Sequence, residues 1–143
     1  MNILVIHGPN LKTLGKREPA IYGKGALRQL NAAIRKRAAG KAKVRIFQSN
    51  CEGRLIDLIE ENASWADWLI INPAAYTHYS YAIRDAISAS GLPAVEVHLS
   101  DISRREPFRR VSVIKAVCVK QLKGFGFDSY LRAVDLAVQK NAN

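Results

Sequence analysis

Four apolar stretches of the chain each end in polar residues. These endings are His7-Gly-Pro-Asn10, Gln48-Ser-Asn50, Asn72 and His98-Leu-Ser100. A single polar ending is weak evidence, because strand ends are exposed, but four together indicate a polar pocket. Arg17, Tyr22 and Arg109 add positive charge and a phenol to this set. Such a site suits a small polar anion that carries several hydroxyl groups.

Several common catalytic and binding motifs are absent from the sequence. No G-x-G-x-x-G follows the first predicted strand and no G-x-x-x-x-G-K-[ST] occurs, which argues against a nucleotide site. His7, His78 and His98 have no H-E-x-x-H or C-x-x-C partners, so we expect no metal. There is no G-x-S-x-G elbow for a serine nucleophile.

The segment 68–78 organises the predicted fold. It begins with the apolar residues Trp-Leu-Ile-Ile at 68–71, which are typical of a buried strand. The strand is expected to stop at Asn72-Pro73, since proline cannot donate to a sheet. A helical pattern then runs from about residue 78 to 90. Ligands of open α/β sheets bind outside the carboxyl ends of the strands, which places Asn72 and His78 on the side of the chemistry.

The rest of the chain alternates strands with helices. Further strands are predicted at residues 3–7, 44–47, 93–98 and about 114–122, and helices at about 26–39, 55–63 and 129–139. This alternation indicates one α/β domain over residues 1–143, a parallel sheet between two layers of helices. The flavodoxin-like strand order 2-1-3-4-5 fits five strands best. The segment 8–25 is long for a connection, and we hypothesise that it is a mobile active-site lid.

The charge of the chain is uneven. Residues 1–50 hold eleven Lys or Arg and one acid, so the formal net charge of +10 comes from this first third. A solvated helix face is the simpler interpretation of these charges. The alternatives are attraction of nucleic acid, of an acidic membrane or of a small anion.

The sequence predicts a cytoplasmic protein. No apolar run approaches the ~20 residues that span a membrane. The amino-terminal residues enter a strand at once, without a basic region or a cleavage signal. Two cysteines without C-x-x-C spacing fit a reducing compartment.

A set of short motifs carries a resemblance to a known family. They are Gly8-Pro-Asn-Leu, Gly15-Lys-Arg-Glu-Pro, Tyr22-Gly, Gln48-Ser-Asn-Cys-Glu-Gly, Ile71-Asn-Pro-Ala-Ala-Tyr-Thr-His, Val95-Glu-Val-His-Leu-Ser and Arg105-Glu-Pro-Phe-Arg. In order and spacing, these motifs resemble type II 3-dehydroquinate dehydratase over nearly the whole chain. The resemblance implies a flavodoxin-like subunit without a cofactor, usually assembled as a dodecamer of four trimers. The implied reaction converts 3-dehydroquinate reversibly to 3-dehydroshikimate, in the shikimate pathway or in quinate breakdown.

The resemblance also implies roles for the catalytic residues. Tyr22 matches the general base that removes the proton beside the ketone, and Arg17 matches the lid arginine that favours the phenolate. Asn10 matches a residue that helps to hold the water near the enolate oxygen. His98 matches the general acid that protonates the departing hydroxyl.

For the remaining matched residues, the resemblance implies roles in substrate binding. Asn72 and His78 match groups that contact the substrate and orient the general acid. The backbone N–H groups of Leu99 and Ser100 match a cradle for its carboxylate, and Arg109 matches a ligand of the ring hydroxyls. Asp85 matches an acid that, in the family's oligomer, reaches into the site of a neighbouring subunit.

Physical chemistry agrees with these implied roles. A tyrosine base near pH 7 requires its pKa to fall from about 10 to about 7, and nearby cations favour the phenolate. Arg17 lies in the same segment as Tyr22. Because residues two apart on a strand point to the same side, Glu96 is expected to orient the His98 imidazole.

Several residues depart from the commoner family pattern. They are Lys12, Cys51, Ala74 and the pair Arg110-Val111. None of them removes a matched catalytic group. His7 stands where the family varies, and we interpret it as structural. Arg105 belongs to a charged run that is expected to be solvated, or to approach the lid.

The alternative hypothesis is a catalytically lapsed homologue that binds an anionic partner such as nucleic acid. The basic first third of the chain motivates this hypothesis. A lapsed copy should have lost part of the set formed by Arg17, Tyr22, Asn72 and His98. Because the set is complete, the sequence favours the enzyme, and nucleic acid is not expected as a partner.

Overall fold

The computed structural model of the protein describes residues 1–16, 18–22 and 25–143. Within them, five parallel strands form one sheet in the order β2-β1-β3-β4-β5. The strands are β1 (Asn2–His7), β2 (Lys43–Gln48), β3 (Trp68–Asn72), β4 (Ala94–His98) and β5 (Lys120–Lys123). This order confirms the flavodoxin-like topology predicted from the sequence.

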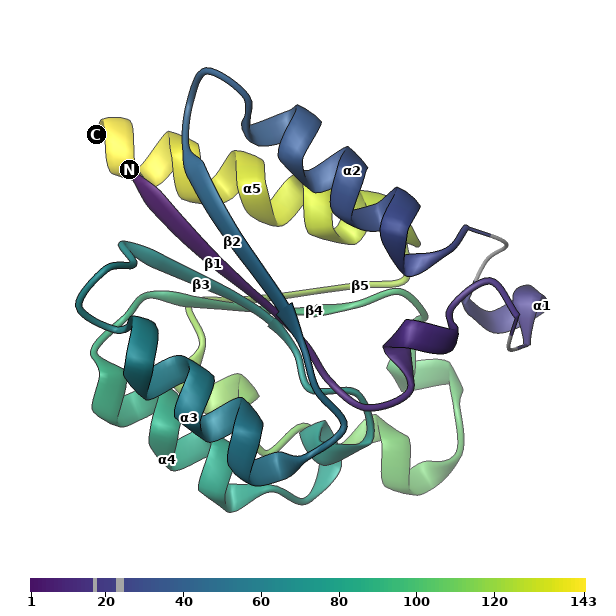
Figure 1. Ribbon diagram of the computed structural model, residues 1–143. Coiled ribbons are helices and arrows are strands. Elements are labelled where there is room, and N and C mark those ends of the chain that lie inside the picture. Colours follow the sequence, from purple (N-terminus) through teal and green to yellow (C-terminus); the bar gives the residue numbers. More distant parts are fainter. Residues whose placement is uncertain (17, 23–24) are drawn as a thin grey trace.

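Two pairs of helices cover the sheet, one pair on each face (Figure 1). On one face lie α2 (Leu27–Ala38) and α5 (Phe127–Ala142), and on the other lie α3 (Glu52–Asn62) and α4 (Tyr81–Ser90). Each helix turns a stripe of apolar residues inward, as an amphipathic helix does. In α2, for example, Leu30, Ile34 and Ala38 are buried. The predicted three-layer arrangement is therefore confirmed.

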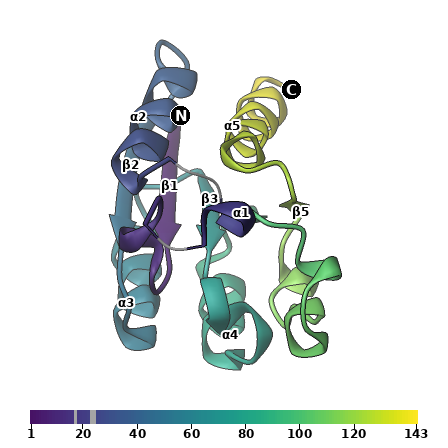
Figure 2. The ribbon, with the colours of Figure 1, turned by 90° about the vertical axis from the view of Figure 1, so that its right-hand side faces the viewer.

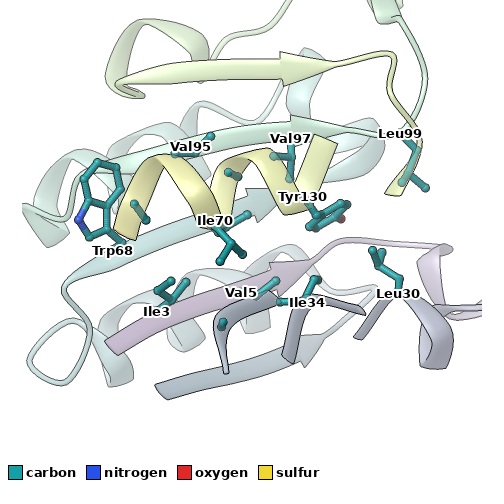
Figure 3. Close-up of a cluster of buried hydrophobic side chains, with 14 of the residues drawn as sticks. Ile3, Val5, Leu30, Ile34, Trp68, Ile70, Val95, Val97, Leu99 and Tyr130 are labelled. Atoms are coloured by element: carbon teal, nitrogen blue, oxygen red, sulfur yellow. The ribbon is translucent and has the colours of Figure 1, made fainter. Parts of the chain in front are cut away.

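Alternate residues of each strand enter different cores. In β1, Ile3 and Val5 pack under α2 and α5, while Leu4 and Ile6 pack under α3 and α4. Figure 3 shows the first of these cores, in which the ring of Tyr130 lies near the carboxyl ends of the strands. The alternation follows from the two-residue period of a strand. It also decides from which face each polar strand ending approaches the site.

Two predicted elements begin later than the sequence pattern indicated. The helix predicted from residue 78 begins at Tyr81, because Ser80 is its N-cap and accepts a hydrogen bond from the Ile83 N–H at 3.0 Å. The strand predicted at 114–122 is β5, which begins only at Lys120. Ile114, Val117 and Cys118, which precede β5, pack instead against the α3 and α4 core, with a 3₁₀ turn at Lys115–Val117. In so short a run, the pattern of apolar residues does not distinguish a strand from a turn that packs against helices.

Short elements gather at the carboxyl ends of the strands. They are the 3₁₀ turns Leu11–Thr13, Ala74–His78, Ile102–Arg104 and Pro107–Arg110 and the short helix α1 (Pro19–Tyr22). In Figure 1, α1 lies beyond the carboxyl ends of the strands. In Figure 2, where this side faces the viewer, α1 lies in front of the sheet. No helix among the described residues is long and apolar enough to cross a membrane.

Candidate active site

A cavity of about 200 Å³ opens at the carboxyl ends of the strands. It is lined by these residues predicted from the sequence: Asn10, Asn72, His78, His98, Leu99, Ser100 and Arg109. Pro9, Ala74 and Arg105 also line it. The location agrees with the expectation for an open parallel sheet. The cavity therefore brings together residues from three strand ends and from the segment after β4.

The loops after β1 and β3 are joined by a close approach at Gly8. The Gly8 N–H donates to the Asn72 carbonyl oxygen at 2.7 Å. A Cβ atom at position 8 would lie 2.5 Å from the carbonyl carbon of Pro73, which is closer than real contacts allow. A glycine is therefore required here. This contact fixes the spacing of the two loops that carry Asn10 and Asn72.

His98 reaches the cavity from the α3 and α4 side of the sheet, supported by a buried carboxylate. His98 Nε2 lies 2.6 Å from Oε1 of Glu96, and Glu96 is fully buried. Gln121 on β5 donates from its Nε2 to the same oxygen at 3.0 Å. Burial raises the pKa of Glu96, but the hydrogen bonds and charge of His98 and the bond from Gln121 outweigh it, so that the pKa is lowered.

The protonation of this pair follows from its geometry. Because its pKa is lowered, Glu96 is an ionised carboxylate at neutral pH and only accepts hydrogen bonds. The hydrogen between the two side chains therefore sits on His98 Nε2. The other ring nitrogen, Nδ1, is left to serve the cavity that His98 lines. This confirms the prediction that Glu96 orients the His98 ring.

His78 is held with a hydrogen-bond acceptor available to the cavity. Its Nδ1 donates to the Val111 carbonyl oxygen at 2.7 Å, and its ring packs edge-on against Phe108. Burial lowers the pKa of His78, with the hydrogen bond to Val111 acting in the other direction. The ring is thus neutral at pH 7, and its Nε2 carries a lone pair. A substrate hydroxyl is a suitable partner for that lone pair.

Two arginines give the cavity a cationic wall. Arg105 and Arg109 both line it, and their side chains are 13% and 21% exposed. Arg109 stacks over Phe108 at 4.6 Å and forms an ion pair with Glu106, with Nε and Oε2 2.7 Å apart. Guanidinium groups bind carboxylates and hydroxyls through a rigid set of donors. The wall therefore suits an anionic, hydroxylated ligand.

The backbone at Asn10 and Ala74 is in the left-handed conformation. Their φ angles are +68° and +53°. Asparagine tolerates this conformation, whereas alanine pays about 1 kcal/mol for it. The turn at Ala74 is held by its N–H, which donates to Asn72 Oδ1 at 3.1 Å. Ala74, one of the departures from the commoner family pattern, is therefore accommodated with some strain beside the cavity.

The second polar ending supports the site without lining the cavity. Asn50 Oδ1 accepts the Asn10 N–H at 3.1 Å and Gln48 Nε2 at 3.0 Å. Tyr76 donates its hydroxyl to the Asn50 carbonyl oxygen at 3.0 Å. Neither Gln48 nor Asn50 is among the residues of the cavity wall. The ending at 48–50 therefore holds the segments that follow β1 and β3 through hydrogen bonds to Asn10 and Tyr76.

Three predicted site residues are not brought to the cavity by the described part of the chain. Arg17 lies outside the described residues, as does the side chain of Tyr22, whose backbone ends α1. Asp85 is exposed on α4 and does not line the cavity. Ile21 of α1 borders a groove next to the cavity, together with Ser100. The helix that ends at Tyr22 thus lies close to the segment after β4.

The sequence pattern missed two supporting residues, Gln121 and Tyr130. Gln121 pairs with Glu96 across the β4 and β5 ladder, and the strand register is the signal that would have found it. Tyr130 lies in α5, fully buried, and contacts Asn72. No short-range sequence signal connects it with position 72.

The chain is similar to known proteins over nearly its whole length. The family model described as "Dehydroquinase class II" matches residues 1–138. A 3-dehydroquinate dehydratase from Geotalea daltonii is 55% identical over 132 residues, which cover 92% of both chains. One from Dictyoglomus turgidum is 52% identical over 136 residues, which cover 94% of both. The crystal structure of a type II dehydroquinase from Butyrivibrio crossotus superposes with a TM-score of 0.93 at 46% identity, over 96% of this chain and 97% of that one.

Proposed function

From the premise that this chain belongs to the class II dehydroquinase family, we propose that it dehydrates 3-dehydroquinate to 3-dehydroshikimate, as a hydro-lyase. One observation carries the proposal: His98 and Arg109 line the same cavity. His98 is held there by its hydrogen bond with the buried Glu96 carboxylate. An acid held by a carboxylate can protonate a leaving hydroxyl. An arginine wall favours a substrate that bears a carboxylate.

The reaction proceeds in two steps. The Tyr22 phenolate takes a proton from the carbon beside the ketone, and the electron pair of that C–H bond forms an enolate. The enolate then re-forms the ketone and expels the hydroxyl group from the adjacent carbon, while His98 gives that group a proton from Nδ1. One water molecule leaves, and a C=C bond conjugated with the ketone remains. No oxidant or reductant is needed.

His98 acts as the acid in its doubly protonated form. The Glu96 carboxylate 2.6 Å from Nε2 stabilises positive charge on the ring. After the proton has left Nδ1, the ring remains hydrogen-bonded to Glu96 through Nε2. Asn10, which lines the cavity, helps to hold a water against the enolate oxygen, where negative charge develops.

The other lining residues bind the substrate. The backbone N–H groups of Leu99 and Ser100 hold its carboxylate, and Arg109 binds ring hydroxyls. His78 accepts a hydrogen bond from a substrate hydroxyl through Nε2, which its bond to Val111 leaves available. Asn72 donates a hydrogen bond from its amide. All of these groups border the same cavity.

The segment 8–25 acts as a lid of a single domain that spans residues 1–143. It carries Arg17 and Tyr22, and the arginine favours the phenolate when the lid is closed. The position of α1 beyond the strand ends, with Ile21 beside Ser100, supports this role (Figure 2). Closure also excludes water from the enolate.

The functional unit is a homo-oligomer, a dodecamer built from four trimers, in which Asp85 enters the site of a neighbouring subunit. The exposure of Asp85 on α4, away from the cavity of its own chain, agrees with such a role. The enzyme works in the cytoplasm, in the shikimate pathway or in quinate breakdown. Sedimentation is expected to give about 190 kDa, for twelve copies of 15.9 kDa. A species of one or two copies contradicts the assembly.

The reaction is tested by the near-ultraviolet absorbance of the conjugated enone product. Purified protein mixed with 3-dehydroquinate is expected to produce this absorbance. Tyr22→Phe is expected to abolish turnover while it still binds substrate, and His98→Ala is expected to abolish the rise as well. Tyr81→Phe serves as the matched control, because Tyr81 is 65% exposed on α4 and lies outside the cavity wall.

Two outcomes contradict the proposal. No rise from folded, assembled wild-type protein contradicts the activity. A Tyr22→Phe variant with near wild-type turnover contradicts the base assignment alone. In the first case, a salt-dependent titration with nucleic acid would test the alternative based on the basic first third of the chain.

A further inference from the structure

A row of polar side chains leads from α2 to the cavity wall. His7, at the end of β1, contacts Asn31 Oδ1 through Nε2 at 2.8 Å and the Tyr130 hydroxyl through Nδ1 at 3.0 Å. The Asn72 side chain lies next to the Tyr130 hydroxyl and lowers the pKa of that phenol. His7 and Asn72 are paired in the ladder of β1 and β3, so their side chains leave the sheet on the same face. Figure 3 shows Tyr130 at the carboxyl end of the core on that face.

The direction of each hydrogen bond follows from the groups involved. Burial lowers the pKa of His7 to about 4, with the bond to Asn31 acting in the other direction, so that the ring is neutral at pH 7. The Asn31 carbonyl oxygen requires a donor, so Nε2 carries the hydrogen and Nδ1 is an acceptor. Tyr130 therefore donates its O–H to His7.

The Tyr130 oxygen is then left as an acceptor for Asn72. Burial strongly raises the pKa of Tyr130, so that the phenol stays protonated, and the Asn72 side chain acts in the other direction. An amide N–H that points at the phenol oxygen has this effect, because it favours negative charge there. The amide nitrogen of Asn72 is a donor suited to this oxygen.

The other end of the Asn72 amide is also fixed. Its Oδ1 accepts the Ala74 N–H at 3.1 Å, inside the turn that follows β3. A flipped amide would place its oxygen against a phenol oxygen whose hydrogen is already committed to His7, and its nitrogen against an N–H donor. Only one orientation of the amide satisfies both neighbours.

We propose that His7 and Tyr130 are positioning residues, which hold the Asn72 amide so that its second N–H is donated to the substrate. The inference rests on the proposed function, through the substrate contact of Asn72. It extends that function to residues which neither touch the cavity nor carry charge. Without Tyr130, the Ala74 N–H is the one contact left to hold the amide among those described above, and a smaller fraction of the molecules presents the donor.

The test is a double-mutant cycle on Tyr130 and Asn72, with kcat and KM measured for 3-dehydroquinate. Tyr130→Phe removes one hydroxyl and is expected to raise KM about tenfold, with kcat within about twofold of wild type. Asn72→Ala is expected to raise KM further. In the Asn72→Ala background, Tyr130→Phe is expected to change KM by less than about twofold, because the group on which it acts is gone.

Val134→Ala is the matched control. Val134 lies in the same helix and core as Tyr130 and is also fully buried, but it makes no hydrogen bond through its side chain. It is expected to lower stability and leave KM unchanged. This control separates a positioning role from a general loss of packing.

Variants of His7 extend the test. His7→Asn keeps an acceptor near the place of Nδ1, whereas His7→Leu keeps none. KM for His7→Asn is expected to lie several-fold below that for His7→Leu. Equal KM values for these two variants overturn the inference.

The cycle distinguishes the inference from the function on which it rests. Equal effects of Tyr130→Phe in the presence and absence of Asn72 overturn the positioning role and leave the substrate role of Asn72 standing. A wild-type KM for Asn72→Ala overturns both. Loss of all activity in the wild-type protein instead contradicts the dehydratase.

Discussion

The site is supported from the two faces of the sheet in different ways. On the α3 and α4 face, His98 is backed by a buried charge, Glu96, and by Gln121. On the α2 and α5 face, Asn72 is backed by Tyr130 and His7, which are both neutral. The residue proposed to give up a proton thus has a charged partner. The residue proposed to donate only a hydrogen bond has neutral partners.

The difference has a physical reason. An acid that gains and loses a proton needs a partner which stabilises its positive form, and a carboxylate does so strongly in a buried environment. A buried charge is costly unless it is paired, and Glu96 is held by hydrogen bonds from two side chains. An amide that only needs a fixed direction requires no such charge. A neutral chain orients it without burying another ion.

The largest expected contrast is between the two supported residues themselves. His98→Ala is expected to lower kcat by about 10³-fold, since general acid catalysis contributes roughly 10²–10⁴. Asn72→Ala is expected to act mainly on KM. Steady-state kinetics of the two variants measure this division. Equal losses of kcat in both contradict the distinction between a proton donor and a hydrogen-bond donor.

The neutral state of His7 in the folded protein is expected to make the stability depend on pH. The pKa of His7 is lowered to about 4 in the folded protein, against 6.5 as its ordinary value. Between these values the unfolded chain binds a proton that the folded protein does not. Stability is therefore full above pH 6.5 and falls as the pH drops towards 4, by up to about 3 kcal/mol.

Urea unfolding of wild type and His7→Asn at pH 7 and pH 4.5 measures this loss. The variant lacks the histidine, so the drop in its unfolding free energy between the two pH values is expected to be smaller. An identical drop in both proteins means that His7 is charged in the folded state. The neutral chain to Tyr130 would then be wrong.

Removal of the Glu96 charge is expected to lower kcat less than removal of His98, the proposed acid. Glu96→Gln keeps a hydrogen-bonding side chain but removes the charge that stabilises the imidazolium. We expect kcat to fall by about 10²-fold, which corresponds to about 2.7 kcal/mol. His98 is retained in this variant, so KM should change little. A wild-type kcat would show that orientation of the ring, and not charge, is what Glu96 supplies.

The smallest expected effect on kcat is that of substituting Gln121, which donates a hydrogen bond to Glu96. Gln121→Met removes one hydrogen bond to Glu96 and keeps the volume of the side chain. The expected fall in kcat is roughly threefold to tenfold, the worth of a single hydrogen bond. Lys120→Met, at an exposed neighbouring position on β5, is the control and should leave kcat unchanged. Equal values for the two variants contradict a role for Gln121.

The sequence by itself determined those parts of the protein that depend on local spacing. Alternating strands and helices predicted the three layers, and the polar strand endings predicted the edge at which the cavity lies. The pairing of Glu96 with His98 was predictable because residues two apart on a strand share a face. The start of β5 was not predictable from the sequence. The apolar residues before Lys120 could form either a strand or a turn that packs on α3 and α4.

Tertiary structure alone decided which side chains contact the proposed site residues from behind. Gln121 meets Glu96 only because β5 pairs beside β4 in one register. Tyr130 meets Asn72 only because α5 crosses back over the sheet, which brings together residues 58 positions apart in the chain. Neither contact leaves a periodic trace in the sequence. Local spacing fixes the face on which a residue lies, and long-range packing fixes its partner there.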